Sequence, residues 1–184
     1  MLPLLALPPN DCPTAGGLRA LRVWPAANVV LPAGYRPGDV HLTQAIGLRD
    51  PLNYADVWFL PDSAGFDEPE GLDGQGPVYR PQLVCYVSRD APDLAEGVAR
   101  LSAWRYLVAA YMDANGQTKL VGAPDYPLVF TGGLETGKRG PDKNGYPLVF
   151  AGQGPARAPF YLMLSQGPAP QRRAFSAGFS FGFK

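Results

Sequence analysis

Glycine and proline recur so often along this chain that few stretches remain in which a long helix could form. The sequence contains 22 Gly and 21 Pro, about 23% of its residues against roughly 12% in average usage. Proline removes a backbone donor and glycine loses the most conformational freedom on folding, so both disfavour helix interiors. Nine Tyr and nine Phe favour strands. The sequence therefore predicts many short strands joined by turns.

Alternating apolar and polar residues predict several strands. Residues 18–24 form the first, which residues 28–31 could extend. Residues 54–60 alternate clearly and are predicted as a strand. Residues 78–88 form another, restricted to an edge or broken at Pro81 because proline cannot donate to the ladder.

Residues 104–112 are apolar on both faces of a predicted strand. One face belongs in the domain's own core. The other has to be covered by the helix, by another sheet or by a neighbouring subunit. This surplus is the main physical reason to expect association with partners.

The second half of the chain predicts a hairpin and a repeated strand. Residues 113–116, Asp-Ala-Asn-Gly, form a tight turn, from which 117–121 return antiparallel. Tyr126-Pro-Leu-Val-Phe130 recurs as Tyr146-Pro-Leu-Val-Phe150, which predicts two strands of one sheet. Residues 159–164 supply one more strand.

One short helix is predicted near 91–102, with Asp90 as its cap. Leu94, Val98 and Leu101 recur on one face and form its buried stripe.

These elements predict a mainly β, α+β fold: an antiparallel β-sandwich or barrel-like domain with one short flanking helix and extended termini. Residues 1–17 form an N-terminal arm. Residues 18–165 form the core domain, which includes an acidic loop at 61–77. Residues 166–184 form a Phe-rich C-terminal arm or strand.

Charge and composition argue against several classes of partner. Sixteen basic and 16 acidic residues cancel, whereas nucleic-acid binders need a basic excess, so no sequence-specific nucleic-acid binding is expected. No segment approaches the roughly 20 apolar residues of a membrane span. Residues 1–9 lack the basic start of a signal peptide. Cys12 and Cys85 are two reduced thiols or one bridge, and the sequence leaves both open.

Motifs for chemistry are incomplete, so we expect no enzyme activity, cofactor or metal. Residues 132–138 match much of a phosphate-binding loop, but Arg139 replaces the Mg²⁺-binding Ser or Thr, which favours a hairpin loop. The Asp-x-Asn-Gly stretches at 113–116 and 142–145 lack the twelfth-position Glu of a calcium loop. His41 is the only histidine and lies in no recognisable catalytic motif.

The termini and charged loops are the candidate interface between subunits. Phe175, Phe179, Phe181 and Phe183 either fill the domain's own core or form a strand that adds to a neighbour's sheet edge. Acidic residues of the 61–77 loop and basic residues near 138 either stack subunits head to tail or lie on two solvated loops that never meet. The charged candidates are Asp67, Glu68 and Glu70 on one side, and Lys138 and Arg139 on the other. The wider basic set also includes Lys143, Arg157, Arg172 and Arg173.

Several segments resemble small virion proteins encoded among the tail genes of tailed bacteriophages. They are Cys12-Pro-Thr-Ala-Gly-Gly-Leu18, Met112-Asp-Ala-Asn-Gly-Gln-Thr-Lys-Leu-Val-Gly122, Tyr126-Pro-Leu, Thr136-Gly, Asn144-Gly-Tyr146 and Pro-Phe-Tyr161. The resemblance implies a virion location after assembly in the host cytoplasm, a tail-tube-like β-sandwich with a helix, and contacts with other virion proteins.

The expected function is therefore a tail tube or tube-associated subunit that assembles with copies of itself into rings. A tail-terminator or head–tail completion protein is one alternative. A monomeric binding β-sandwich that exposes Trp24, Tyr54 and Trp58 is another. An enzyme using His41 is the remaining alternative.

Overall fold

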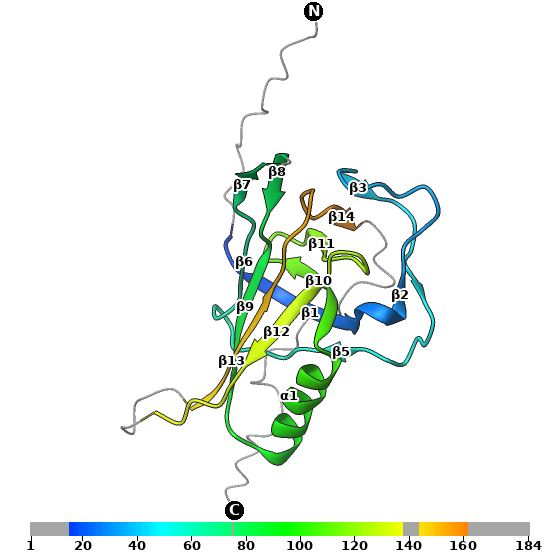
Figure 1. The fold of residues 1–184 in the computed structure, drawn as a ribbon. Helices are drawn as coiled ribbons and strands as arrows, with labels where there is room; N and C mark the ends of the chain where they lie inside the picture. The colour runs from blue at the N-terminus through cyan, green and yellow to red at the C-terminus, as the bar shows by residue number, and fades with distance from the viewer. Residues whose placement is uncertain (1–14, 75, 138–143, 162–184) are drawn as a thin grey trace, which may run out of the picture.

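Strand β10 (Tyr106–Asp113) lies at the centre of the largest sheet (Figure 1). The computed structural model describes residues 15–74, 76–137 and 144–161. One edge of β10 pairs antiparallel with β1 (Leu18–Pro25) along most of its length. The other edge is shared by β11 (Thr118–Val121) and β12 (Leu128–Gly132). The sheet therefore branches at β10.

The β12 branch curls back toward β1 and gives the domain a barrel-like shape. It continues antiparallel through β13 (Gly145–Ala151), β9 (Gln82–Ser88) and β6 (Gly65–Asp67). The curl closes where the Leu18 amide donates to the Ala64 carbonyl at 3.2 Å, just before β6. The predicted mainly β, barrel-like fold with one helix is confirmed.

Smaller elements surround the barrel. From β11 the sheet passes to β14 (Phe160–Tyr161) and then to β3 (His41–Leu42), which is parallel to β14. Two further pairs form separate sheets, and two short elements complete the structure. These are β2 (Val29–Val30) with β4 (Gly47–Leu48), β7 (Glu70–Asp73) with β8 (Gly76–Tyr79), β5 (Ala55–Asp56) beside β1, and a 3-10 turn at Ala26–Asn28.

Both faces of β10 are covered within the chain from Leu107 to Tyr111, whereas Tyr106 at its start is exposed. Leu107 and Ala109 point into the barrel core, which includes Leu21, Leu83 and Phe150. The opposite face contributes to a second cluster built by β1, β11, β14 and residues 26–46, whose members are Trp24, Ala26, Val29, Leu42, Ile46, Val108, Ala110, Leu120 and Tyr161. Of the covers that the sequence left open, elements of the same chain are the ones observed, so this face of β10 leaves no surplus apolar surface for a neighbouring subunit.

The helix α1 (Pro92–Trp104) confirms the helix predicted near 91–102. Leu101 is buried in the barrel core, and Leu94 and Val98 pack against it. The predicted Asp90 cap is wrong, because Ala91 occupies the cap position without a side-chain hydrogen bond. Trp104, predicted to begin a strand, ends the helix instead.

Residues 54–60 do not form the predicted continuous strand; only Ala55–Asp56 does. The predicted alternation is present, since Val57 and Phe59 are buried and Trp58 is exposed. However, the backbone changes partner along the segment. Val57 donates to Leu21 of β1, whereas Leu60 donates to Tyr86 of β9. A segment that crosses from one strand to another cannot keep a regular ladder with either.

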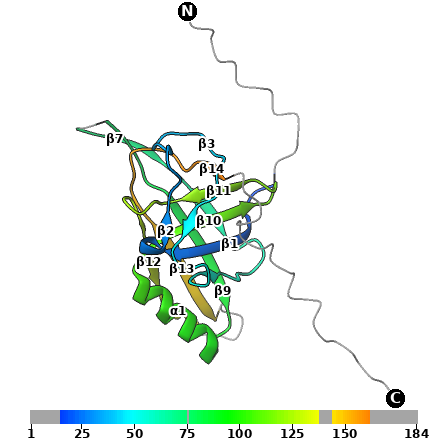
Figure 2. The ribbon, with the colours of Figure 1, turned by 90° about the vertical axis from the view of Figure 1, so that its right-hand side faces the viewer.

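Residues 61–77, predicted as a long loop, contain β6, β7 and the start of β8. Phe66 anchors this region, because its ring lies 4.8 Å from that of Tyr111 and packs on the core. The β7–β8 hairpin extends away from the barrel (Figure 2). Gly and Asp have low strand propensity, so only these tertiary contacts and cross-strand pairing reveal the strands.

Other predicted strands are placed as follows. Residues 28–31 do not extend β1, because the 3-10 turn intervenes and Val29–Val30 pairs with β4. The break at Pro81 is confirmed between β8 and β9. The repeated segments pair with each other, with Phe130 opposite Phe150, as predicted.

Candidate functional site

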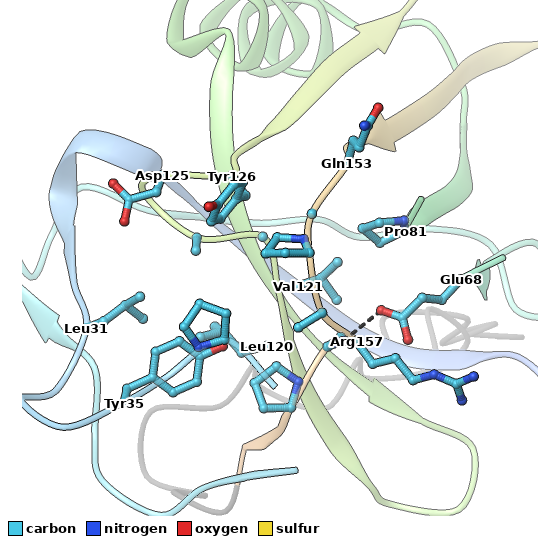
Figure 3. Close-up of a pocket in the computed structure, with 18 residues that line it drawn as sticks. Leu31, Tyr35, Glu68, Pro81, Leu120, Val121, Asp125, Tyr126, Gln153 and Arg157 are labelled. Carbon is cyan, nitrogen blue, oxygen red and sulfur yellow. Dashed lines mark hydrogen bonds between the residues drawn. The ribbon is translucent and has the colours of Figure 1, made fainter. Parts of the chain in front are cut away.

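Three chain segments, together with Glu68 and Pro81, surround a cleft with a volume of about 270 Å³ (Figure 3). One segment precedes β3, one follows β11, and one connects β13 to β14. The lining is rich in proline and also contains two tyrosines, Tyr35 and Tyr126. The prolines are Pro37, Pro81, Pro155 and Pro159. A concave, mostly apolar surface with a few polar groups is the usual form of a binding site.

Backbone hydrogen bonds hold the walls of the cleft in place. Ala123 and Tyr126 exchange two bonds of 3.1 and 3.0 Å, which close the turn after β11. Leu120 donates to the Pro159 carbonyl at 3.1 Å, and Gly154 exchanges two 2.9 Å bonds with Tyr79. The segment after β13 is thereby fixed to both β11 and β8.

Acidic groups reach the cleft from two sides. Asp125 is exposed, and among the described residues its carboxylate has no hydrogen bond or ion pair. Glu68 accepts a 2.7 Å hydrogen bond from the amide of Ala158. Arg157 pairs with Glu70 at 2.9 Å, and hydrogen bonds to Glu70 and Tyr79 raise its pKa. Asp125 is thus a negative charge that the described residues leave available.

The predicted charged interface is only partly described. Glu68 and Glu70 bond to Ala158 and Arg157 of the same chain, while Asp67 is exposed on β6. The acidic segment therefore meets Arg157 within one subunit, which the sequence did not predict. Four Phe residues and two basic residues of the predicted interface lie outside the described residues: Phe175, Phe179, Phe181, Phe183, Lys138 and Arg139.

A second candidate surface, missed from the sequence, lies on the outside of the barrel. We name it the outer sheet face: the outward side chains of β9, β12 and β13 with Tyr106 beside them. Val84, Val129 and Tyr106 are 39%, 43% and 48% exposed. Strand pairing places Val84 opposite Val149, and Val129 opposite Ala151 and Tyr106. None of the outward residues is charged; they are Gln82, Val84, Tyr86, Tyr106, Val129, Thr131, Pro147, Val149 and Ala151.

The alternation in these strands is visible in the sequence, but it does not say which side faces the core. Leu83, Cys85, Leu128, Phe130, Leu148 and Phe150 are larger on average and fill the barrel. The opposite, smaller set remains outside. Only the arrangement of the strands shows that much of this side stays exposed, although Tyr86 is buried there.

The residues considered for chemistry are dispersed. His41 is exposed on β3, with its ring 5.7 Å from that of Phe160. Cys85 is buried in β9, and burial raises its pKa to about 12; Cys12 lies outside the described residues. Among the residues that the structure describes, no cluster of three His, Cys, Asp or Glu could hold a metal ion. No helix in the same part of the chain is long and apolar enough to cross a membrane.

The aromatic residues of the alternative binding surface do not share an exposed face. Trp24 is buried in the second cluster, with 1% of its surface exposed. Tyr54 lies under the Arg22 guanidinium, 4.4 Å from the ring centroid. Arg22 in turn forms two hydrogen bonds to Asp56, at 2.6 and 2.9 Å. Of the three aromatic residues, Trp58 is the most exposed.

The geometry thus offers two surfaces for binding, the proline-lined cleft and the outer sheet face. A comparison of the chain with protein-family models, with curated proteins and with solved structures finds no match.

Proposed function

We propose that this protein is a structural subunit of a bacteriophage virion, a tail tube or tube-associated protein that assembles into rings. The observation that carries the proposal is the outer sheet face. Its outward side chains are uncharged and mostly apolar along β9, β12 and β13, and Val84, Val129 and Tyr106 are exposed, whereas Tyr86 is buried and Pro147 and Val149 are half-buried.

A partly exposed apolar sheet face favours association. Soluble monomers rarely expose large contiguous apolar patches, and such patches commonly mark protein–protein contacts. Neighbouring side chains across the strands keep this surface continuous, from Val84 through Val149 to Thr131. A second copy of the chain is the occupant that the proposed ring requires.

The observed architecture agrees with the plan that the phage resemblance implies, a β domain with one flanking helix. The same architecture fits a tail-terminator protein, which forms finite rings. Because these three comparisons find no match, the proposal depends on the outer sheet face and on those sequence segments. Direct observation of assembly is therefore the decisive test.

The test is negative-stain imaging and light scattering of the full chain over a wide concentration range. Rings or tubes are the expected result. Tubes that extend with concentration support the tube subunit, and rings that stay single support the terminator. A particle that remains monomeric at every concentration contradicts both.

Two substitutions locate the contact. Val84→Glu and Val129→Glu place a charge on the outer sheet face and should raise the concentration needed for assembly about tenfold or more, since burying an unpaired charge is costly. Leu52→Glu is the matched control, because Leu52 is 84% exposed on a loop outside that face. Thermal unfolding of each variant separates lost assembly from lost folding. If Val84→Glu and Leu52→Glu assemble equally, the outer sheet face is not the interface.

A further inference from the structure

We propose that the cleft binds a segment of the chain's own C-terminal region, residues 168–173, Pro-Ala-Pro-Gln-Arg-Arg. The segment lies outside the described residues. Three features of the structure favour it: the shape of the cleft, its charge and its position next to the end of β14. The inference does not depend on assembly of the protein into rings.

The cleft has the surface chemistry that recognises proline-containing peptides. Tyr35 and Tyr126 stand among prolines on its walls (Figure 3). Grooves lined by aromatic rings bind extended proline-rich segments, because such segments lose little conformational entropy on binding. Pro168 and Pro170 supply two pyrrolidine rings at alternate positions.

Charge complementarity selects this segment. Arg172 and Arg173 follow Pro170 after one intervening residue, Gln171. Asp125 presents an exposed carboxylate without a partner among the described residues, and guanidinium groups pair well with carboxylates. The proline-containing N-terminal residues 1–9 carry no basic side chain, so the C-terminal segment fits better.

The chain's own connectivity brings the segment close. Residues 155–159 line the cleft and lead directly into β14, which ends at Tyr161. Pro168 follows seven residues later, and seven residues span up to about 23 Å when extended. A short tether gives an effective concentration in the millimolar range. The segment of the same chain should therefore occupy the cleft in preference to the segment of a neighbouring copy, unless the protein concentration reaches the same millimolar range.

Disulfide trapping in the full chain tests the proposal. Gln153→Cys places a thiol on the cleft wall, and Ala174→Cys places a second thiol just after the segment. The background carries Cys12→Ser, and the remaining Cys85 stays buried in β9. Under mild oxidation we expect an intramolecular disulfide. It should form at least tenfold faster than in the control with Ala99→Cys and Ala174→Cys, because Ala99 is exposed on α1, which contributes no residue to the cleft. Helix α1 lies at the opposite end of the molecule from β3 and β14 (Figure 1).

A charge reversal tests the role of Asp125. Adding Asp125→Lys to the trapping variant should slow disulfide formation at least fivefold, while Asp93→Lys on α1 makes the same change elsewhere and should leave the rate unchanged. High salt should slow the reaction in the same direction. The inference would be overturned if the disulfide formed at equal rates in the Gln153→Cys/Ala174→Cys variant and in the Ala99→Cys/Ala174→Cys control. Disulfides formed only between chains would overturn the assignment to the same chain.

Discussion

At Gly145, the first residue of β13, the chain passes so close to β9 that no side chain fits. A β-carbon built there would overlap the Val87 carbonyl oxygen and lie 2.9 Å from the Ser88 α-carbon. Gly145 also exchanges two backbone hydrogen bonds with Glu135, of 2.8 and 2.9 Å. It therefore joins three segments at a point where backbone contacts leave no free space.

Gly145→Ala should lower the free energy of unfolding by about 1–3 kcal/mol, the usual cost of overpacking, because backbone atoms cannot yield as a flexible side chain can. Urea titration of the variant measures the effect. Gly133→Ala is the matched control, since a β-carbon at Gly133 meets nothing within 4 Å. A similar stability for both variants would show that β13 can move away from β9 at little cost.

At the scale of elements, helix α1 begins without a side-chain cap. Ala91 has the extended backbone of a cap residue, with φ −146° and ψ 148°, but no side-chain oxygen. Asp90, the residue that the sequence indicated, accepts a 2.6 Å hydrogen bond from the Tyr146 hydroxyl instead. That bond is the main cause of the raised pKa of Tyr146. It ties the residue before the helix to β13.

Ala91→Ser should therefore stabilise the protein by about 0.5–2 kcal/mol, because a serine hydroxyl can accept from a free amide of the first turn. Thermal unfolding should show a higher Tm. Ala99→Ser on the exposed face of the same helix is the control and should lower stability slightly, since serine is a weaker helix former than alanine. If both variants behave alike, the first-turn amides already have adequate partners.

At the scale of the whole molecule, two clusters on opposite faces of β10 are each formed within the described part of the chain. The barrel core lies on one face, and the second cluster lies on the other, closed by Ile46, Leu42 and Tyr161. The chain reaches this arrangement by folding residues 26–48 back over β10. A surface that the sequence marks as a candidate for partners is thus interior.

Ile46→Ala should lower the free energy of unfolding by about 2–5 kcal/mol through the cavity that it leaves. Because its neighbours belong to the same chain, the loss should be equal at low and high protein concentration. Thermal unfolding at two concentrations about 100-fold apart measures this, with Leu52→Ala, 84% exposed, as the control. A loss that shrinks at high concentration would mean that a partner completes this cluster.

The candidate surfaces differ in how far the sequence reveals them. Tyr35, Pro81, Asp125 and Arg157 come from separate parts of the chain, and only long-range hydrogen bonds bring them around one cleft. No local pattern marks such a site. The outer sheet face has a local pattern, but its exposure depends on which elements the chain places over it.

The amino-acid sequence alone determined the mainly β class, the helix at α1, the 113–116 turn and the pairing of the repeated strands, because these follow from local periodicity and turn chemistry. The partner change along residues 54–60, the strands within 61–77 and the covering of both faces of β10 were decided by tertiary structure. They depend on contacts between residues distant in sequence, where backbone hydrogen bonding and burial outweigh local propensity.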